Sequence, residues 1–130
     1  MVDKRLMAHL ALASLLSLAV ADILLVFLVA VDVLSGHESL AVATPKMIYF
    51  ALLAGVSSFA LPLVWWGHRI GYYVAMAVAL VSLLANLSGI GSALRGAVPF
   101  DVNVASAIVG LAISAILLVA GAIASRSRPA

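Results

Sequence analysis

The stretch "LMAHLALASLLSLAVADILLVFLVAVDVL", residues 6–34, decides the fold. Its only acidic or basic side chains, histidine aside, are Asp22 and Asp32. A helix needs ~20 mostly apolar residues to cross ~30 Å of hydrocarbon, so this stretch predicts a membrane-spanning helix that is tilted or projects beyond the bilayer. Residues 1–21 also resemble a signal peptide, but the apolar run continues after Asp22, and we expect a retained helix.

Three more apolar segments follow, separated by short polar stretches. Together the four predicted spans cover residues 6–34, 47–66, 70–94 and 102–124. The 130 residues are 66% hydrophobic and 9% charged, whereas soluble domains carry about 25% charged residues. Because short loops make neighbouring helices antiparallel, the sequence predicts a single all-α domain over residues 1–130: an antiparallel four-helix bundle integral to a lipid bilayer.

Helix boundaries and orientation are also predicted. Thr44 and Pro45 look like an N-cap followed by proline in the first turn, and Pro99 with Asp101 looks like the start of the fourth span. Asp32 is expected to pair with Lys46 or to meet solvent.

One side of the bundle would carry more basic residues than the other, which predicts that both termini are cytoplasmic. The basic residues on that side are Lys4, Arg5, Arg69, Arg126 and Arg128, against Lys46 and Arg95 opposite.

The composition favours a multi-pass protein of a prokaryotic plasma membrane. Glutamine is absent, and alanine, valine, leucine, glycine and arginine are heavily used, which is typical of GC-rich or thermophilic prokaryotes.

Small residues recur at helical spacing along three of the spans. Residues three and four apart share a helix face, and small residues let helices approach closely in lipid. The second span has Ala51, Gly55 and Ser58, the third has Ala75, Ala79, Ser82, Asn86 and Gly89, and the fourth has Ser106, Gly110 and Ser114. We expect Gly55, Ala79, Ser82, Gly110 and Ser114 to pack helices together, either inside the bundle or, for at least one stripe, against another subunit.

One polar residue from each span falls at a similar depth. Asp22 and Asn86 each lie sixteen residues into their spans, roughly 24 Å at ~1.5 Å per residue. Tyr49 and Ser106, on helices of opposite direction, reach a similar level. These four residues are predicted to form an intramembrane polar cluster.

Asp22 has two interpretations. A carboxylate within a bilayer is costly and is expected to face inward, and no basic residue falls within a predicted span. Asp22 is therefore expected to hold a proton or to be reached by water. It is either a proton- or cation-exchanging group of a transport path, or a structural residue that forms hydrogen bonds or meets a cation from another protein.

Other chemistry has little support in the sequence. The absence of cysteine excludes disulfides and thiolate sites, and the serines lack a base and acid for nucleophilic catalysis. Haem or metal binding by His9 and His68 is a third possibility. The basic residues are too dispersed to indicate nucleic-acid binding. We therefore expect no catalytic residue, cofactor or metal.

In outline the chain resembles the small multidrug resistance transporters, which have four spans and an acid in the first helix. The resemblance implies that this acid binds a proton and a cationic drug. Here the acid is Asp22 rather than glutamate, it comes late in a longer helix, and the sequence shows no aromatic box around it.

These observations together predict a non-catalytic accessory or assembly subunit of a larger integral membrane complex, respiratory or otherwise energy-converting. Its partners would be larger membrane-protein subunits. The alternative is a small homo-oligomeric proton- or cation-coupled transporter or channel that uses Asp22.

Overall fold

The computed structural model describes residues 4–96 and 102–126. They form four α-helices: α1 (Lys4–Leu34), α2 (Leu40–Trp65), α3 (Arg69–Leu94) and α4 (Val102–Ser125). All four are long and apolar enough to cross a membrane. The predicted all-helical, four-helix architecture is thereby confirmed, whereas the expected role of Pro99 and Asp101 lies outside the described residues.

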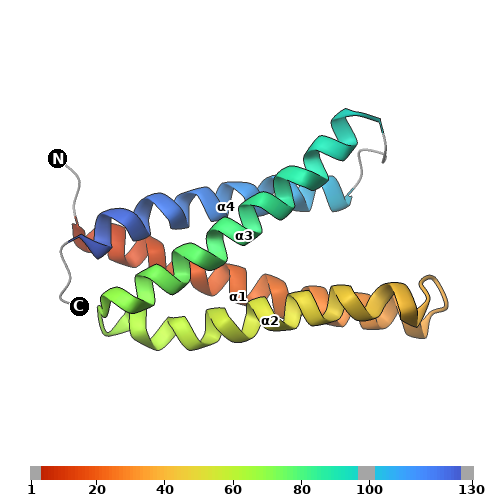
Figure 1. Cartoon of the computed structure of the whole chain (residues 1–130), viewed down its shortest axis with the longest axis horizontal. Helices are drawn as coiled ribbons and strands as arrows, with labels where there is room; N and C mark the ends of the chain where they lie inside the picture. Colours follow the sequence, from red (N-terminus) through yellow and green to blue (C-terminus); the bar gives the residue numbers. More distant parts are fainter. Residues whose placement is uncertain (1–3, 97–101, 127–130) are drawn as a thin grey trace.

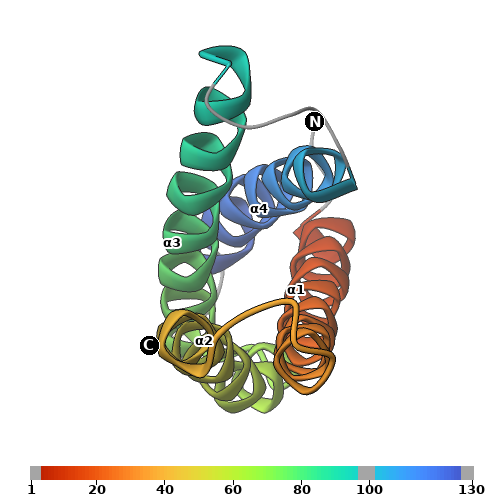
Figure 2. The ribbon, with the colours of Figure 1, turned by 90° about the vertical axis from the view of Figure 1, so that its right-hand side faces the viewer.

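The helices pack in a ring, each against its neighbours in the chain, and α4 also packs on α1. Helices α1 and α3 barely touch, as expected for diagonal members of the ring. The start of α1, the α2–α3 turn and the end of α4 lie together at what we call the closed end (Figure 1). Toward the opposite, diverging end, the α1–α2 hairpin separates from the α3–α4 hairpin (Figures 1 and 2).

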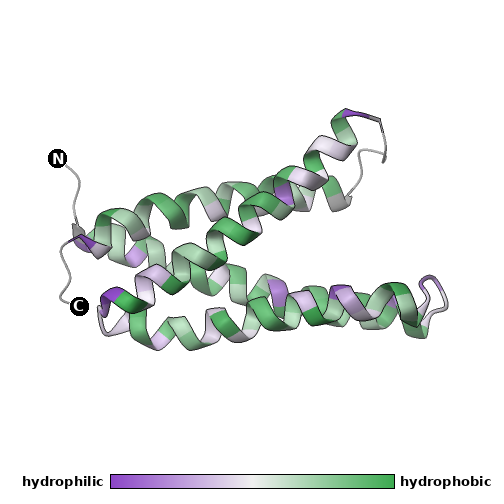
Figure 3. Ribbon diagram, viewed as in Figure 1, coloured by the Kyte–Doolittle hydropathy of each residue, from purple (hydrophilic) through white to green (hydrophobic). Residues whose placement is uncertain are grey.

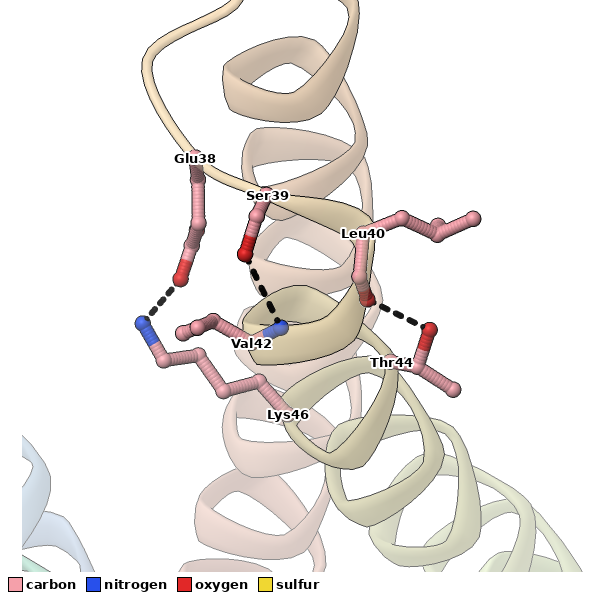
Figure 4. Close-up of polar contacts among 6 residues, drawn as sticks. All are labelled: Glu38, Ser39, Leu40, Val42, Thr44 and Lys46. Atoms are coloured by element: carbon pink, nitrogen blue, oxygen red, sulfur yellow. Dashed lines mark hydrogen bonds and ion pairs between the residues drawn. The ribbon is translucent and has the colours of Figure 1, made fainter.

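Helix α2 begins seven residues before the predicted span, at Leu40 instead of residue 47. Ser39 is the N-cap, and its hydroxyl accepts a hydrogen bond from the Val42 backbone N–H at 3.3 Å (Figure 4). The prediction that Thr44 caps the helix is therefore wrong. Thr44 Oγ1 instead donates to the Leu40 carbonyl at 2.7 Å, and Pro45 lies inside the helix.

Lys46 consequently belongs to α2 and not to the loop. Its Nζ forms an ion pair with Glu38 Oε1 at 2.5 Å (Figure 4). Of the two alternatives expected for Asp32, pairing with Lys46 is therefore wrong and exposure to solvent agrees with the structure. Asp32 is exposed, and its backbone carbonyl accepts from the N–H groups of His37 and Glu38 where α1 ends. Glu38 is the nearer partner because it directly precedes the N-cap of α2.

Side chains are buried mainly between the closed end and the middle of the bundle. Leu15, Tyr72 and Leu117 are the largest apolar side chains that are fully buried, and most other core positions are alanines, which allow the helices to approach closely. The core cluster comprises Ala11, Leu15, Leu18, Leu53, Ala60, Val64, Tyr72, Ala75, Val78, Ala79, Leu117, Ala120 and Ala124.

The outer faces of the helices are apolar. Leucines, valines, isoleucines and phenylalanines are exposed along all four helices; Phe59, for example, is 65% exposed. Figure 3 shows mostly apolar helices, with hydrophilic positions at the ends and turns and a few more within the helices. An apolar surface of this extent fits contact with lipid or with other apolar helices.

The closed end depends on a close approach between α2 and α3. A Cβ atom on Gly71 would lie 2.6 Å from Leu63 Cβ and 2.7 Å from the Val64 backbone nitrogen. Between the helices, Gly67 adopts a φ of 79°, a left-handed conformation that glycine reaches without steric cost. The two glycines fix a tight turn, and Tyr72 follows in the first turn of α3.

Candidate functional site

A pocket of about 150 Å³ lies where the continuous core ends, and all four helices contribute to its wall. This volume is well above the ~10–15 Å³ needed to hold one water molecule. The four polar residues placed at a common depth by the sequence all line it, together with Ser82. The polar lining residues are Asp22, Tyr49, Ser82, Asn86 and Ser106.

Asp22 is the most buried acidic or basic side chain among the described residues, with 6% of its surface exposed. Its Oδ2 atom is buried and has no hydrogen-bond partner among the described residues. Among the described residues, the ion pair joins Lys46 to Glu38. Asp22 therefore has no cationic partner within the described part of the chain. A buried carboxylate oxygen without a partner carries a desolvation penalty that a proton, a cation or a hydrogen-bond donor would remove.

Asn86 reaches the pocket because the facing residue on α4 is glycine. A Cβ atom on Gly110 would lie 2.6 Å from Asn86 Nδ2 and 3.2 Å from its Cγ. Gly110, which has no side chain, thus leaves room between α3 and α4 for the Asn86 amide. Asn86 supplies both a carbonyl acceptor and an N–H₂ donor.

Two aromatic rings from α2 also line the pocket. Tyr49 and Phe50 have ring centroids 5.3 Å apart and an interplanar angle of 63°, an edge-to-face pair, and both lie in the pocket wall with Asp22. Two neighbouring rings of one helix therefore share the pocket wall with Asp22. The depth comparison identified Tyr49, but it missed Phe50 because it considered only polar residues.

The predicted packing residues divide into two groups. Ala79, Ser82 and Ser114 are buried inside the chain. Gly55 is exposed, and a Cβ atom built on it would meet nothing within 4 Å. Packing of Gly55 within the bundle is therefore contradicted. Its stripe mates Ala51 and Ser58 are exposed as well, because α2 turns its opposite face to α1 and α3.

The histidines do not form a joint site. His9 Nδ1 lies 2.9 Å from the Arg5 carbonyl and lines a second pocket, at the closed end, whose wall does not include His68. His68 instead precedes α3 as its N-cap residue. Among the residues that the structure describes, no group of three or more histidine, aspartate or glutamate side chains could hold a metal ion.

The pocket around Asp22 is lined by oxygen atoms of three chemical kinds. Carboxylate, amide and hydroxyl oxygens are the ligands that hard cations prefer, and all three kinds line it.

No protein-family model, curated protein or solved structure matches this chain. The similarity to the small multidrug resistance transporters is one of outline alone.

Proposed function

We propose that this chain is a non-catalytic accessory or assembly subunit of a larger integral membrane complex, a respiratory or other energy-converting one. The observation that carries the proposal is the outward position of the small-residue stripe on α2. Ala51, Gly55 and Ser58 face away from the bundle, and nothing in the described chain lies within 4 Å of a Cβ at Gly55. Small residues permit close backbone contact between helices in lipid, so this face suits a helix of another subunit.

The proposed setting is a prokaryotic plasma membrane with both termini in the cytoplasm. Arg5, Arg69 and Arg126 support this orientation, since they belong to the start of α1, the start of α3 and the residue after α4, which gather at the closed end (Figure 1). Cytoplasmic segments of membrane proteins are enriched in such residues. A reporter fused to the C-terminus that is active only in the cytoplasm would test the orientation.

Native mass spectrometry of protein released gently from its own membranes tests the accessory role. We expect the chain in a complex of fixed stoichiometry with larger subunits. The variant Gly55→Leu should no longer copurify with the complex. A leucine fits at position 55 of the isolated fold, but it prevents a helix of another subunit from packing closely there. Ala112→Leu, on an exposed face of α4, is the matched control and should remain bound. A wild-type chain found only as a monomer or homo-oligomer would refute the proposal.

A second candidate is a homo-oligomeric proton- or cation-coupled transporter or channel. It is favoured by the pocket around Asp22, to which every helix contributes a wall residue. In vesicles containing the purified protein, Asp22→Asn should abolish proton-coupled uptake of a test cation. Asp32→Asn, an exposed acid on the same helix, should not. Equal uptake by wild type and Asp22→Asn would exclude this candidate.

A further inference from the structure

The Asp22 pocket is bordered by regular helix faces. On α1, α3 and α4 its lining residues follow the spacing of one helix face: Leu18, Ala21, Asp22 and Leu25; Ser82, Ala85 and Asn86; and Ser106, Val109, Gly110 and Ile113. Asp22 lies in the middle of the α1 face. The next two residues, Ile23 and Leu24, are 44% and 56% exposed, whereas Asp22 is 6% exposed. The carboxylate therefore turns toward the pocket and away from the outer surface.

The negative charge of Asp22 is not balanced within the pocket. Among the described lining residues there is no lysine, arginine or histidine, and Asp22 is the only acidic one. Its Oδ2 atom is buried without a hydrogen-bond partner in the described chain. One carboxylate in an apolar bundle favours one positive charge, because a divalent ion would leave an uncompensated charge in a low dielectric.

Neutral oxygen atoms from the other three helices line the same pocket. They belong to the hydroxyl groups of Tyr49, Ser82 and Ser106 and to the amide of Asn86, and such oxygens are ligands that hard cations prefer. At about 150 Å³, the pocket has room for an ion and for water molecules that complete its coordination. A proton would neutralise Asp22, but it would leave these oxygens and this space without a ligand.

We propose that the Asp22 pocket binds one monovalent alkali-metal cation, Na⁺ or K⁺, between the Asp22 carboxylate and the neutral oxygens of α2, α3 and α4. The proposal rests on the pocket that favours the second candidate function, and it names the ion held there. It does not require transport. A bound cation would also tie the α1–α2 hairpin, which supplies Asp22 and Tyr49, to the α3–α4 hairpin, which supplies the other oxygens.

The first test measures protection of Asp22 from dicyclohexylcarbodiimide, an apolar reagent that reacts with protonated carboxyl groups. The purified full chain in nonionic detergent is labelled at constant pH and ionic strength, and labelled peptides are quantified by mass spectrometry. NaCl and KCl are compared with N-methylglucamine chloride, whose organic cation is bulky. At roughly ten times its dissociation constant, Na⁺ or K⁺ should slow labelling of Asp22 about tenfold. Asp32, exposed on the same helix, is the internal control and should show no such protection.

Two matched pairs of variants locate the ligands. Ser82→Ala should weaken cation binding about fivefold, whereas Ser88→Ala, which changes an exposed serine of the same helix, should not. Tyr49→Phe removes a lining hydroxyl and should act like Ser82→Ala, whereas Tyr73 lies outside the pocket and Tyr73→Phe should have no effect.

Melting temperatures give a second measurement that does not depend on the reagent. A ligand that binds only the folded chain stabilises it, so Na⁺ or K⁺ should raise the melting temperature of the wild type and of Asp32→Asn. Neither ion should raise that of Asp22→Asn, relative to N-methylglucamine.

The possible outcomes separate the site from transport. Labelling and melting that respond equally to all three salts, or to none, would overturn the proposal, and so would equal binding by both members of each variant pair. Protection by only one of the two ions would support the site and identify that ion. Protection without cation uptake in vesicles would reject the transport candidate alone, whereas proton-coupled uptake without protection would reject the cation site alone.

Discussion

The two halves of the bundle use similar residues and pack them differently. Toward the closed end, Leu15, Tyr72 and Leu117 are fully buried among alanines contributed by all four helices. Toward the diverging end, beyond the Asp22 pocket, large apolar side chains such as Phe27 and Leu34 face outward. Hydropathy is high in both halves, so the difference comes from how closely the backbones approach and not from apolar content.

The largest effect should come from removing a core side chain in the closed half. Leu15→Ala leaves a cavity among tightly packed neighbours and should lower the free energy of unfolding by about 3 kcal/mol. Leu16→Ala changes the next residue, which is 51% exposed, and should cost less than about 0.5 kcal/mol. Unfolding in detergent would measure both. Equal losses would show that the closed half has no packed core.

A glycine from each half gives the next largest contrast. Gly71→Ala should destabilise the chain by about 2 kcal/mol, because the new methyl group meets the backbone between Leu63 and Val64. At Gly89, in the diverging half, the nearest atom to an added Cβ is Ala107 Cβ at 3.9 Å. Gly89→Ala should therefore stabilise by up to about 1 kcal/mol. Melting temperatures of the two variants should move in opposite directions.

The boundary between the halves can be tested at Gly110. Gly110→Ala should displace the Asn86 amide, whose Nδ2 lies 2.6 Å from the added Cβ, and should cost about 1 kcal/mol. The cost is moderate because Asn86 can turn aside. In an Asn86→Ala background the same change should cost almost nothing, a coupling that a double-mutant cycle of unfolding free energies measures. Additive effects would show that the two residues do not meet.

The smallest effect is expected at the tip of the diverging half. Breaking the Lys46–Glu38 ion pair with Lys46→Met should cost about 0.5 kcal/mol, because the lysine side chain is half exposed. The loss should shrink at high salt, where exposed charges are screened. Glu38→Gln should give a similar loss, and the double variant little more than either single one. A salt-independent loss would argue against an ion pair.

The sequence predicts the helices well because runs of apolar residues report helix existence directly. Depth along a helix is also predictable, since residue counting alone selects Asp22, Tyr49, Asn86 and Ser106, which line one pocket. Rotation about the helix axis is not predictable. Gly55 and Ala79 are both small residues, yet Gly55 faces outward and Ala79 is buried. In an apolar chain, hydropathy does not distinguish a buried face from an outer one.

The start of α2 shows a second limit. Ser39 and Thr44 are both good capping residues, and the proline after Thr44 favours the wrong one. In the structure Ser39 caps the helix, and the Thr44 hydroxyl bonds back to the Leu40 carbonyl. Tyr72 lies close in the sequence to Trp65, Trp66 and Tyr73, which are exposed, but the close contact at Gly71 holds Tyr72 inside the core.

The divergence of the two hairpins has a mechanical consequence. A bundle that is narrow at one end and broad at the other has the shape of a wedge (Figure 1). If its helices cross a bilayer, it displaces more lipid area from one leaflet than from the other. Lateral pressure and leaflet curvature would then act on the angle between the hairpins, and the Asp22 pocket lies at the point where that angle opens.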